Sequence, residues 1–341
     1  MLDRFFRAIL ALALSALVAT PAAACTATAS VTTDFGSYSP AAMKAGAVPA
    51  LPSKAGLACV PSTLLLLSRN YIRATFKSKN LLKLTSSAGT MDYTVSADAG
   101  ATVPFVQGGT VDYLQNNLLN LLGLLGSSNA DLPFYLKPAG GTASAVGSYT
   151  DQITITWEWY ICPGIGALGL CVGIPDSGTA QTTIDVTLVI GPKDVTTKLT
   201  TVTTWDTANG SNYPKAIPGS RQRTAVMVSN PDIVPLDAGS LAIVLPTPNG
   251  SLVALDGDGT AAAVIQSREG STPSTLAITY TDPASGSDDV DFSADGGATW
   301  GYAPVAGNLA SQGAVTHVRL RPRGSMAKQS SFNVSLPYML R

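Results

Sequence analysis

Residues 148–157 read Ser-Tyr-Thr-Asp-Gln-Ile-Thr-Ile-Thr-Trp, and this stretch decides the fold class of the chain. Ile153, Ile155 and Trp157 alternate with polar residues, which is the period-2 pattern of a strand with one buried face. Further short alternating or β-branched segments follow the same rule, and most are separated by Gly, Pro, Asn or Asp. The segments predicted as strands are Tyr93–Ala97, Ile153–Ile161, Thr183–Ile190, Lys198–Trp205, Thr224–Val228, Leu241–Leu245, Leu276–Thr281, Val315–Arg321 and Phe332–Leu336. This spacing predicts an all-β chain built from antiparallel β-sandwiches.

The N-terminus has the three parts of an export signal. Arg4 and Arg7 are followed by an apolar run from Ala8 to Val18, and then by Pro21-Ala22-Ala23-Ala24. We expect cleavage between Ala24 and Cys25, which makes residues 1–24 a signal peptide. The apolar run is shorter than the ~20 residues that a membrane helix needs, so we expect no membrane span. Lipidation of Cys25 is the alternative, and Ala22 disfavours it because lipidation sites carry a bulky aliphatic residue there.

The four cysteines of an exported chain suggest two disulfides, for which three connectivities exist. Cys162 and Cys171 flank a short Gly-rich loop and are natural partners, which leaves Cys25 with Cys59. Neither pair has the Cys-x-x-Cys spacing of a zinc site, and the single histidine lies far away. We therefore expect neither a metal nor another cofactor.

The length of the chain limits the number of domains, and its charge limits the classes of partner that it can bind. The 341 residues suffice for two domains, and Gly191-Pro192-Lys193-Asp194 marks the expected boundary between residues 25–191 and 194–341. Lys and Arg (21) balance Asp and Glu (22) and do not cluster. A nucleic-acid partner is not expected, because a phosphate backbone requires clustered positive charge.

Two leucine-rich stretches depart from the strand pattern. Residues 111–125 carry leucines at helical spacing, which predicts a short amphipathic helix inserted in the first domain. The loop between the last two cysteines is also apolar. In both places the apolar side chains either cover the core or form an exposed contact surface. The residues concerned are Leu114, Leu118, Leu121, Leu122, Leu125, Ile165, Leu168 and Leu170.

Several separated segments of the first domain resemble the spore coat protein U domain family. They are Asp34–Pro40, the second cysteine at Cys59, Tyr93–Gly100, Leu132–Leu136 and Gly147–Trp157. The resemblance implies a pilin-like β-sandwich that passes through the periplasm and joins a fibre on the cell surface. It also implies three partners: a periplasmic chaperone, an outer-membrane usher and other fibre subunits, which bind by donor-strand addition.

The chain departs from this family pattern in two ways. Cleavage after Ala24 leaves no donor segment before the first cysteine, which suggests a subunit at the tip of a fibre. The chain also continues beyond Trp159, where family members stop, and Thr183–Ile190 could pair with Ile153–Ile161 and complete the sandwich in cis. Donor-strand exchange in the first domain would then be in doubt.

The second domain resembles the Ig-like repeat called domain of unknown function 11, through Asn212–Gly219 and Ala225–Pro231. Its usual role is that of a spacer module. Ser293, Asp295, Gly297 and Trp300 resemble an Asp-box hairpin, which is structural, and a single copy does not indicate a glycosidase. A cluster of acidic residues is interpreted as a solvated turn rather than a calcium loop. Its members are Asp282, Asp288, Asp289, Asp291 and Asp295.

These observations together predict a non-enzymatic, exported structural or adhesive subunit of a bacterial surface fibre, placed at its tip. Cell adhesion and biofilm formation are the expected processes. The alternative is a self-complete secreted or cell-envelope β-sandwich protein that is not incorporated in a fibre.

Overall fold

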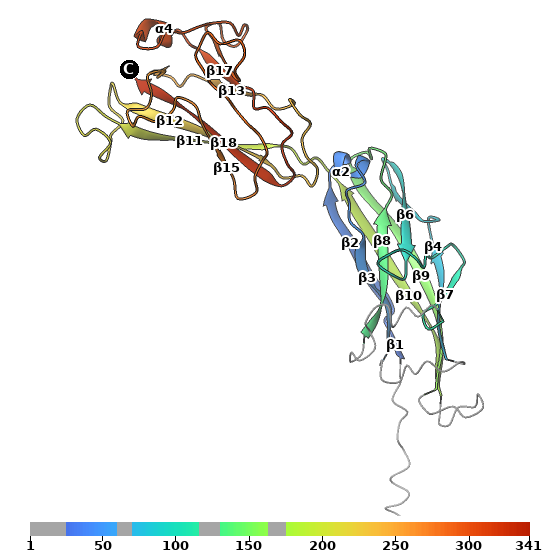
Figure 1. Cartoon of the computed structure of the whole chain (residues 1–341). Coiled ribbons are helices and arrows are strands. Elements are labelled where there is room, and N and C mark those ends of the chain that lie inside the picture. The colour runs from blue at the N-terminus through green and yellow to red at the C-terminus, as the bar shows by residue number, and fades with distance from the viewer. Residues whose placement is uncertain (1–24, 60–69, 116–129, 163–174) are drawn as a thin grey trace, which may run out of the picture. The chain divides into compact units, whose positions relative to one another are not determined.

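The computed structural model describes residues 25–59, 70–115, 130–162 and 175–341. The chain divides into two compact units, Met1–Gly191 and Pro192–Arg341. Both are built from strands, and the described part of the chain contains only two short helices (Figure 1). The predicted all-β fold class is therefore confirmed.

The first unit is a β-sandwich with one short helix. Its strands are β1 (Cys25–Ala27), β2 (Ser30–Tyr38), β3 (Leu51–Cys59), β4 (Tyr71–Ser78), β5 (Lys83–Ser86), β6 (Gly89–Ser96), β7 (Thr110–Asp112), β8 (Ala130–Pro138), β9 (Gly147–Ile161) and β10 (Asp176–Ile190). Helix α2 (Pro40–Lys44) follows β2 directly, because Ser39 caps it and Pro40 occupies its first turn.

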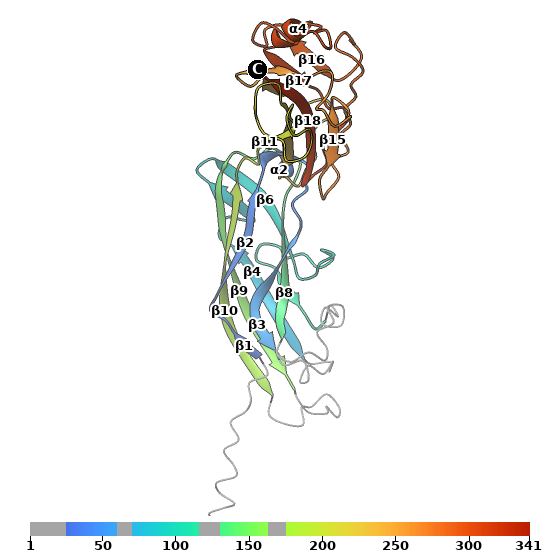
Figure 2. The same cartoon turned by 90° about the vertical axis from the view of Figure 1, so that its left-hand side faces the viewer.

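One layer of the first unit has the order β1-β3-β8-β6, and β4, β9, β10 and β2 lie in the other (Figures 1 and 2). The β5–β6 pair connects the two layers. The inward positions of each strand fill the core, in which Phe76 of β4 packs against Phe134 of β8. The alternation predicted for residues 153–157 is present, since Ile153, Ile155 and Trp157 are fully buried.

The helix predicted over residues 111–125 is wrong where the structure describes it. Residues Thr110–Asp112 form β7, and residues 113–115 form a turn. The Asp112 carboxylate accepts hydrogen bonds from the backbone N–H groups of Leu114 and Gln115. Such side-chain bonds compete with the helical pattern and favour a turn. The rest of the predicted helix lies outside the described residues.

The second unit contains two smaller sheets. Its strands are β11 (Thr196–Trp205), β12 (Arg221–Asn230), β13 (Ile243–Pro246), β14 (Ser251–Val253), β15 (Gln266–Glu269), β16 (Val290–Ser293), β17 (His317–Leu320) and β18 (Ser330–Leu340), and its helix is α4 (Leu309–Gly313). One sheet has the order β11-β12-β18-β14 with β15 also on β18, and the other has the order β13-β17-β16.

The strand predicted over Leu276–Thr281 is absent from the second unit. Ala277 forms only an isolated bridge with Arg323. The backbone N–H groups of Thr279 and Thr281 donate to the carboxylates of Asp289 and Asp288, at 2.7 and 2.9 Å. These amides are therefore bonded to side chains and not to a neighbouring strand.

No helix within the described ranges has the length and apolar character that a bilayer crossing requires. In the same ranges, no three His, Cys, Asp or Glu side chains are placed so that they could hold a metal ion.

Candidate functional site

Strand β10 closes the first unit. It pairs antiparallel with β9 along its whole length, from Asp176 opposite Ile161 to Ile190 opposite Gly147. Its other edge pairs in parallel with β2, from Thr183 opposite Ser30 onward. The predicted hairpin of β9 and β10 therefore exists, and β10 lies between β9 and β2 in its layer. The first sandwich is complete in cis.

The inward side chains of β10 are those of a core strand. Ile184, Val186, Leu188 and Ile190 are at most 1% exposed, whereas Asp185 and Val189 point to solvent. Each buried aliphatic side chain contributes about 1.5–3 kcal/mol through removal of apolar surface from water. A pilin-type acceptor groove needs vacant positions of this kind. In this unit the chain's own residues occupy them.

Thr182 joins β10 to the opposite layer. Its hydroxyl accepts a hydrogen bond from Trp157 Nε1 at 3.2 Å and lies 2.8 Å from the carbonyl oxygen of Thr28 and 3.2 Å from that of Gly56. Gly56 has φ +83°, and a Cβ atom there would lie 2.7 Å from Thr182 Oγ1. Only glycine permits this close approach. The sequence offered no signal for this contact, because residues 56 and 182 are far apart in the chain.

The N-terminal strand is attached covalently. Cys25 and Cys59 are directly opposite each other in β1 and β3 and form the predicted disulfide. A Cys25 sulfur that is bonded to Cys59 cannot carry a thioether-linked lipid. Closing a loop with a sequence separation of 34 contributes about 4 kcal/mol in the chain-entropy picture. Cys171 lies outside the described residues, so its pairing with Cys162 stays a prediction.

Asp151 is a buried carboxylate at the start of the deciding stretch. Its Oδ2 atom accepts hydrogen bonds from Ser78 Oγ and from the Tyr93 hydroxyl, both at 2.6 Å. Its Oδ1 atom accepts from the backbone N–H groups of Asn80 and Gln152 at 3.0 and 2.7 Å. Burial and the hydrogen bond to Asp151 raise the pKa of the Tyr93 phenol well above its usual range. Asp151 thus connects β9, β6 and the turn after β4.

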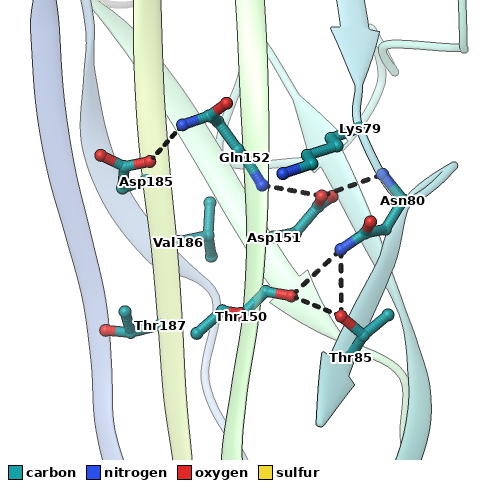
Figure 3. A pocket seen from close by; sticks show the side chains of 9 residues that line it. All are labelled: Lys79, Asn80, Thr85, Thr150, Asp151, Gln152, Asp185, Val186 and Thr187. Carbon is teal, nitrogen blue, oxygen red and sulfur yellow. Dashed lines mark hydrogen bonds between the residues drawn. The ribbon is translucent and has the colours of Figure 1, made fainter.

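A shallow polar pocket of about 370 Å³ lies next to Asp151 (Figure 3). Gln152 Nε2 donates to Asp185 Oδ1 at 2.9 Å, and Asn80 Nδ2 donates to Thr85 Oγ1 at 3.1 Å. Both oxygens of Asp151 accept two hydrogen bonds each, so the protein itself satisfies this carboxylate. These hydrogen bonds hold the side chains of the pocket in place, and the residues that line it include no nucleophile–base pair. The lining residues are Lys79, Asn80, Thr85, Thr150, Asp151, Gln152, Asp185, Val186 and Thr187.

The residues proposed as an apolar contact surface have mixed outcomes. Leu114 is 6% exposed and belongs to the core, so it cannot be part of an exposed surface. The other members, Leu118, Leu121, Leu122, Leu125, Ile165, Leu168 and Leu170, lie outside the described residues, and their role stays a prediction.

The described ends of three leucine-containing segments meet at one end of the first unit. Cys59 is opposite Ala130 in the β3–β8 pair, which brings together the starting point of segment 60–69 and the end point of segment 116–129. Cys162 N–H donates to Asn70 Oδ1 at 3.0 Å, which joins the end point of segment 60–69 to the starting point of segment 163–174. The sequence alone could not group these segments, because their proximity depends on strand pairing.

The Asp-box residues of the second unit form a compact hydrogen-bonded turn. Asp295 accepts hydrogen bonds from Ser293 Oγ at 2.7 Å and from the Thr299 backbone N–H and hydroxyl at 2.9 and 2.7 Å. Gly297 has φ +89° and donates its N–H to Ser293 Oγ. These hydrogen bonds, led by that from the Thr299 hydroxyl, hold the pKa of Asp295 well below its usual range. The Arg319 guanidinium lies over the Trp300 ring at 4.6 Å.

Among the acidic residues before this turn, Asp282 lies in an exposed turn, as the sequence suggested, whereas Asp288 and Asp289 do not. Asp288 and Asp289 are 4% and 2% exposed. Asp289 pairs with Arg323, and Asp291 pairs with both Arg319 and Arg321 at 2.8 Å. Burial of a carboxylate is costly unless it is paired and hydrogen-bonded, and here it is both. The later arginines were the available signal in the sequence.

Strand β11 is an open edge of the second unit. It pairs only with β12 among the strands that the structure describes, and seven of its ten residues are exposed. Leu199 is 60% exposed although it lies opposite Val226, which belongs to the core. Directly opposite residues share a face of the sheet. The core-side face of β11 therefore has no layer over it within this unit.

Comparison with known proteins places the first unit in a family context. A family profile for the Spore Coat Protein U domain matches residues 11–156, which confirms the resemblance predicted for the N-terminal half. The match ends within β9 and before β10. The resemblance of residues 194–341 to domain of unknown function 11 stays a prediction. A search of curated proteins found no match.

Two solved structures show distant likeness. The CsuC-CsuE chaperone-tip adhesion subunit pre-assembly complex from archaic chaperone-usher Csu pili of Acinetobacter baumannii aligns with 93% of this chain and 94% of that chain, at 12% identity and a TM-score of 0.40. A Corynebacterium diphtheriae protein, described as "Putative membrane anchored protein", aligns with 93% of this chain and 50% of that chain, at 12% identity and a TM-score of 0.21. Because both TM-scores lie below 0.5, neither likeness bears on function here.

Proposed function

We propose that this protein is an exported, non-enzymatic subunit of a bacterial surface fibre that a periplasmic chaperone and an outer-membrane usher assemble. The match of residues 11–156 to the Spore Coat Protein U domain carries the proposal. The predicted signal peptide and the Cys25–Cys59 disulfide are consistent with passage through an oxidising compartment. The protein would pass through the periplasm and then remain on the cell surface.

The first unit is not the part that accepts a donor strand from a neighbour. Strand β10 already supplies the buried residues Ile184, Val186 and Leu188, so an incoming strand would have to displace it. The pairing of β10 with β9 and β2 supports the alternative in which Thr183–Ile190 completes the first domain.

The second unit is the better candidate for strand acceptance. Strand β11 offers ten residues of free backbone edge, with Leu199 and Val202 both about 60% exposed. An extended segment of a chaperone or of another subunit would satisfy the backbone groups that point to this edge, and it would lie beside Leu199 on the core-side face and Val202 on the opposite face. A chain with one closed unit and one accepting unit fits the end of a fibre, because only one side needs a partner.

The adhesive contact would then belong to the first unit, at the end where Cys59, Ala130 and Cys162 lie. Segment 60–69 contains four consecutive leucines, segment 116–129 contains six leucines, and segment 163–174 contains two. Their described ends lie together at one end of the sandwich. We propose that leucines of these segments contribute to the adhesive contact, with an apolar surface or a partner protein as the target.

Capture of the tagged mature protein from the periplasm of its own host, with mass spectrometry of its partners, tests the fibre role. We expect a chaperone in a one-to-one ratio. Leu199→Asp should reduce this capture, because it places a charge on the proposed acceptor face. Leu309→Asp is the matched control, since Leu309 is also exposed, at 55%, but lies in α4. It should leave capture unchanged.

The alternative function is a self-complete secreted or cell-envelope protein, and the closure of the first unit by β10 is the observation that favours it. A partner-free monomer that unfolds cooperatively would support this alternative and contradict the fibre role. A glycosidase activity that is lost in Asp295→Ala would contradict the non-enzymatic assignment. We expect that variant to lose stability and to show no turnover before or after the change.

A further inference from the structure

We infer that the α-amino group created when the leader is removed at Cys25 forms an ion pair with Asp176, which fastens the first strand of the sandwich to its closing strand. The inference rests on the export and processing that are part of the proposed function. The observation behind it is a hydrogen bond of 3.1 Å from the Cys25 backbone nitrogen to Asp176 Oδ2. The two residues are 151 positions apart in the chain.

The position of the Cys25 nitrogen is determined by its surroundings. Cys25 is 4% exposed, is bonded to Cys59 through its sulfur, and lies opposite Cys59 at the start of β1. Asp176 is the first residue of β10, opposite Ile161 of β9. The disulfide and the strand pairing therefore hold the nitrogen beside the carboxylate whether or not residues precede Cys25.

Cleavage between Ala24 and Cys25 changes the chemistry of this contact without moving the atom. In the precursor the nitrogen is a neutral amide with one N–H, and hydrolysis of that peptide bond makes it an ammonium group. A hydrogen bond between an ammonium and a carboxylate is roughly twice as strong as a neutral one. An ammonium in a buried position also needs a counter-charge, because burial of an unpaired charge is unfavourable.

Processing of the leader therefore stabilises the closed sandwich. Before cleavage, β10 is held at its beginning by pairing with β9 and by the amide hydrogen bond. After cleavage, Asp176 also holds a positive charge that belongs to β1. The first and last strands of the first unit, β1 and β10, are then joined by an ion pair as well as by packing. The closing strand β10 is therefore harder to displace.

A thermodynamic cycle with the full mature chain tests this inference. The first pair of proteins begins at Cys25 or retains one preceding residue, Ala24, and the second pair repeats this in the Asp176→Asn background. Asp185→Asn is the control, because Asp185 is an exposed carboxylate on the same strand. The readouts are the unfolding equilibrium of the first unit and hydrogen exchange of peptides that cover β1 and β10.

We expect the retained alanine to destabilise the first unit and to raise its equilibrium constant of unfolding by a factor of about three to ten. The same extension should change the constant less than twofold in Asp176→Asn, and it should keep its full effect in Asp185→Asn. An equal effect of the extension in the unchanged chain and in Asp176→Asn would overturn the inference. Acylation of the α-amine near neutral pH should also be faster in Asp176→Asn than in the unchanged chain.

The mature start is measured separately by intact mass. A natural mature chain that does not begin at Cys25 would overturn this inference and leave the fibre role intact. Absence of a captured chaperone would contradict the fibre role and leave the ion pair intact, so the two proposals fail independently.

Discussion

The closure of the first unit by β10 can be tested at Gly56, where β3 approaches Thr182. Gly56→Ala introduces two costs. A residue with a Cβ at φ +83° costs about 1–2 kcal/mol, and the added carbon would lie 2.7 Å from Thr182 Oγ1 and 3.0 Å from its Cβ. Overpacking of this kind typically costs about 1–3 kcal/mol more. We therefore expect a total loss of about 2–5 kcal/mol in the free energy of unfolding of the first unit.

The chain contains a matched control for the backbone part of this cost. Gly36 has the same φ of +83°, and no atom lies within 4 Å of the Cβ that would be added there. Gly36→Ala should therefore cost only the 1–2 kcal/mol of backbone strain, roughly. The difference between the two variants measures the contact between β3 and β10.

Urea denaturation of the mature chain provides the free energies. Hydrogen exchange of peptides from β9 and β10 assigns the relevant transition to the first unit. Thr182→Ala in the Gly56→Ala background should recover part of the loss, because it removes the Oγ1 and Cγ2 atoms that lie nearest to the added carbon. Equal effects of Gly56→Ala and Gly36→Ala would refute the packing of β10 against β3 and, with it, the closure in cis.

Three further perturbations follow from the same structure. Asp151→Ala leaves four donors without their shared acceptor, and it should lower the unfolding free energy of the first unit by more than about 3 kcal/mol in the same denaturation assay. Cys59→Ser removes the disulfide to Cys25 and should lower the free energy of unfolding of the first unit by about 2–5 kcal/mol. In this variant, dithiothreitol should cause no further loss through that disulfide, because it is already absent. Asp206 accepts a hydrogen bond from the Asn209 side chain and three from backbone N–H groups, which hold its pKa well below the usual range. The stability that ionised Asp206 contributes is therefore complete above the unfolded pKa of about 3.9 and is lost as the pH falls through the lower folded pKa. We expect Asp206→Asn to make the melting temperature of the second unit less sensitive to acid. Melting experiments between about pH 5 and pH 2 measure this effect.

The sequence alone determined those features that depend on local pattern. Alternation in residues 153–157 indicated a half-buried strand, and the structure buries Ile153, Ile155 and Trp157. Cysteine spacing together with export predicted the Cys25–Cys59 bridge. The recurrence of short strands with turn residues between them was enough for the all-β class, because side-chain period and turn chemistry are properties of neighbouring residues.

Local pattern failed where side chains from elsewhere satisfied the backbone. Residues 276–281 alternate like a strand, yet the carboxylates of Asp288 and Asp289 bind their amides. Residues 111–125 have leucines at helical spacing, yet residues 113–115 form a turn in which the Asp112 carboxylate binds the Leu114 N–H. Periodicity reports which side chains are apolar, and it does not report which acceptor a given N–H will find.

Tertiary structure alone decided the features that matter most for function. Whether Thr183–Ile190 completes the sandwich depends on a parallel pairing with β2, which joins segments about 150 residues apart. The contacts of Thr182 with Gly56 and of Asp176 with Cys25 arise from the same long-range pairing. Strand propensity and periodicity concern one segment at a time, whereas the choice between a closed and a vacant edge depends on which segment reaches that edge in the folded chain.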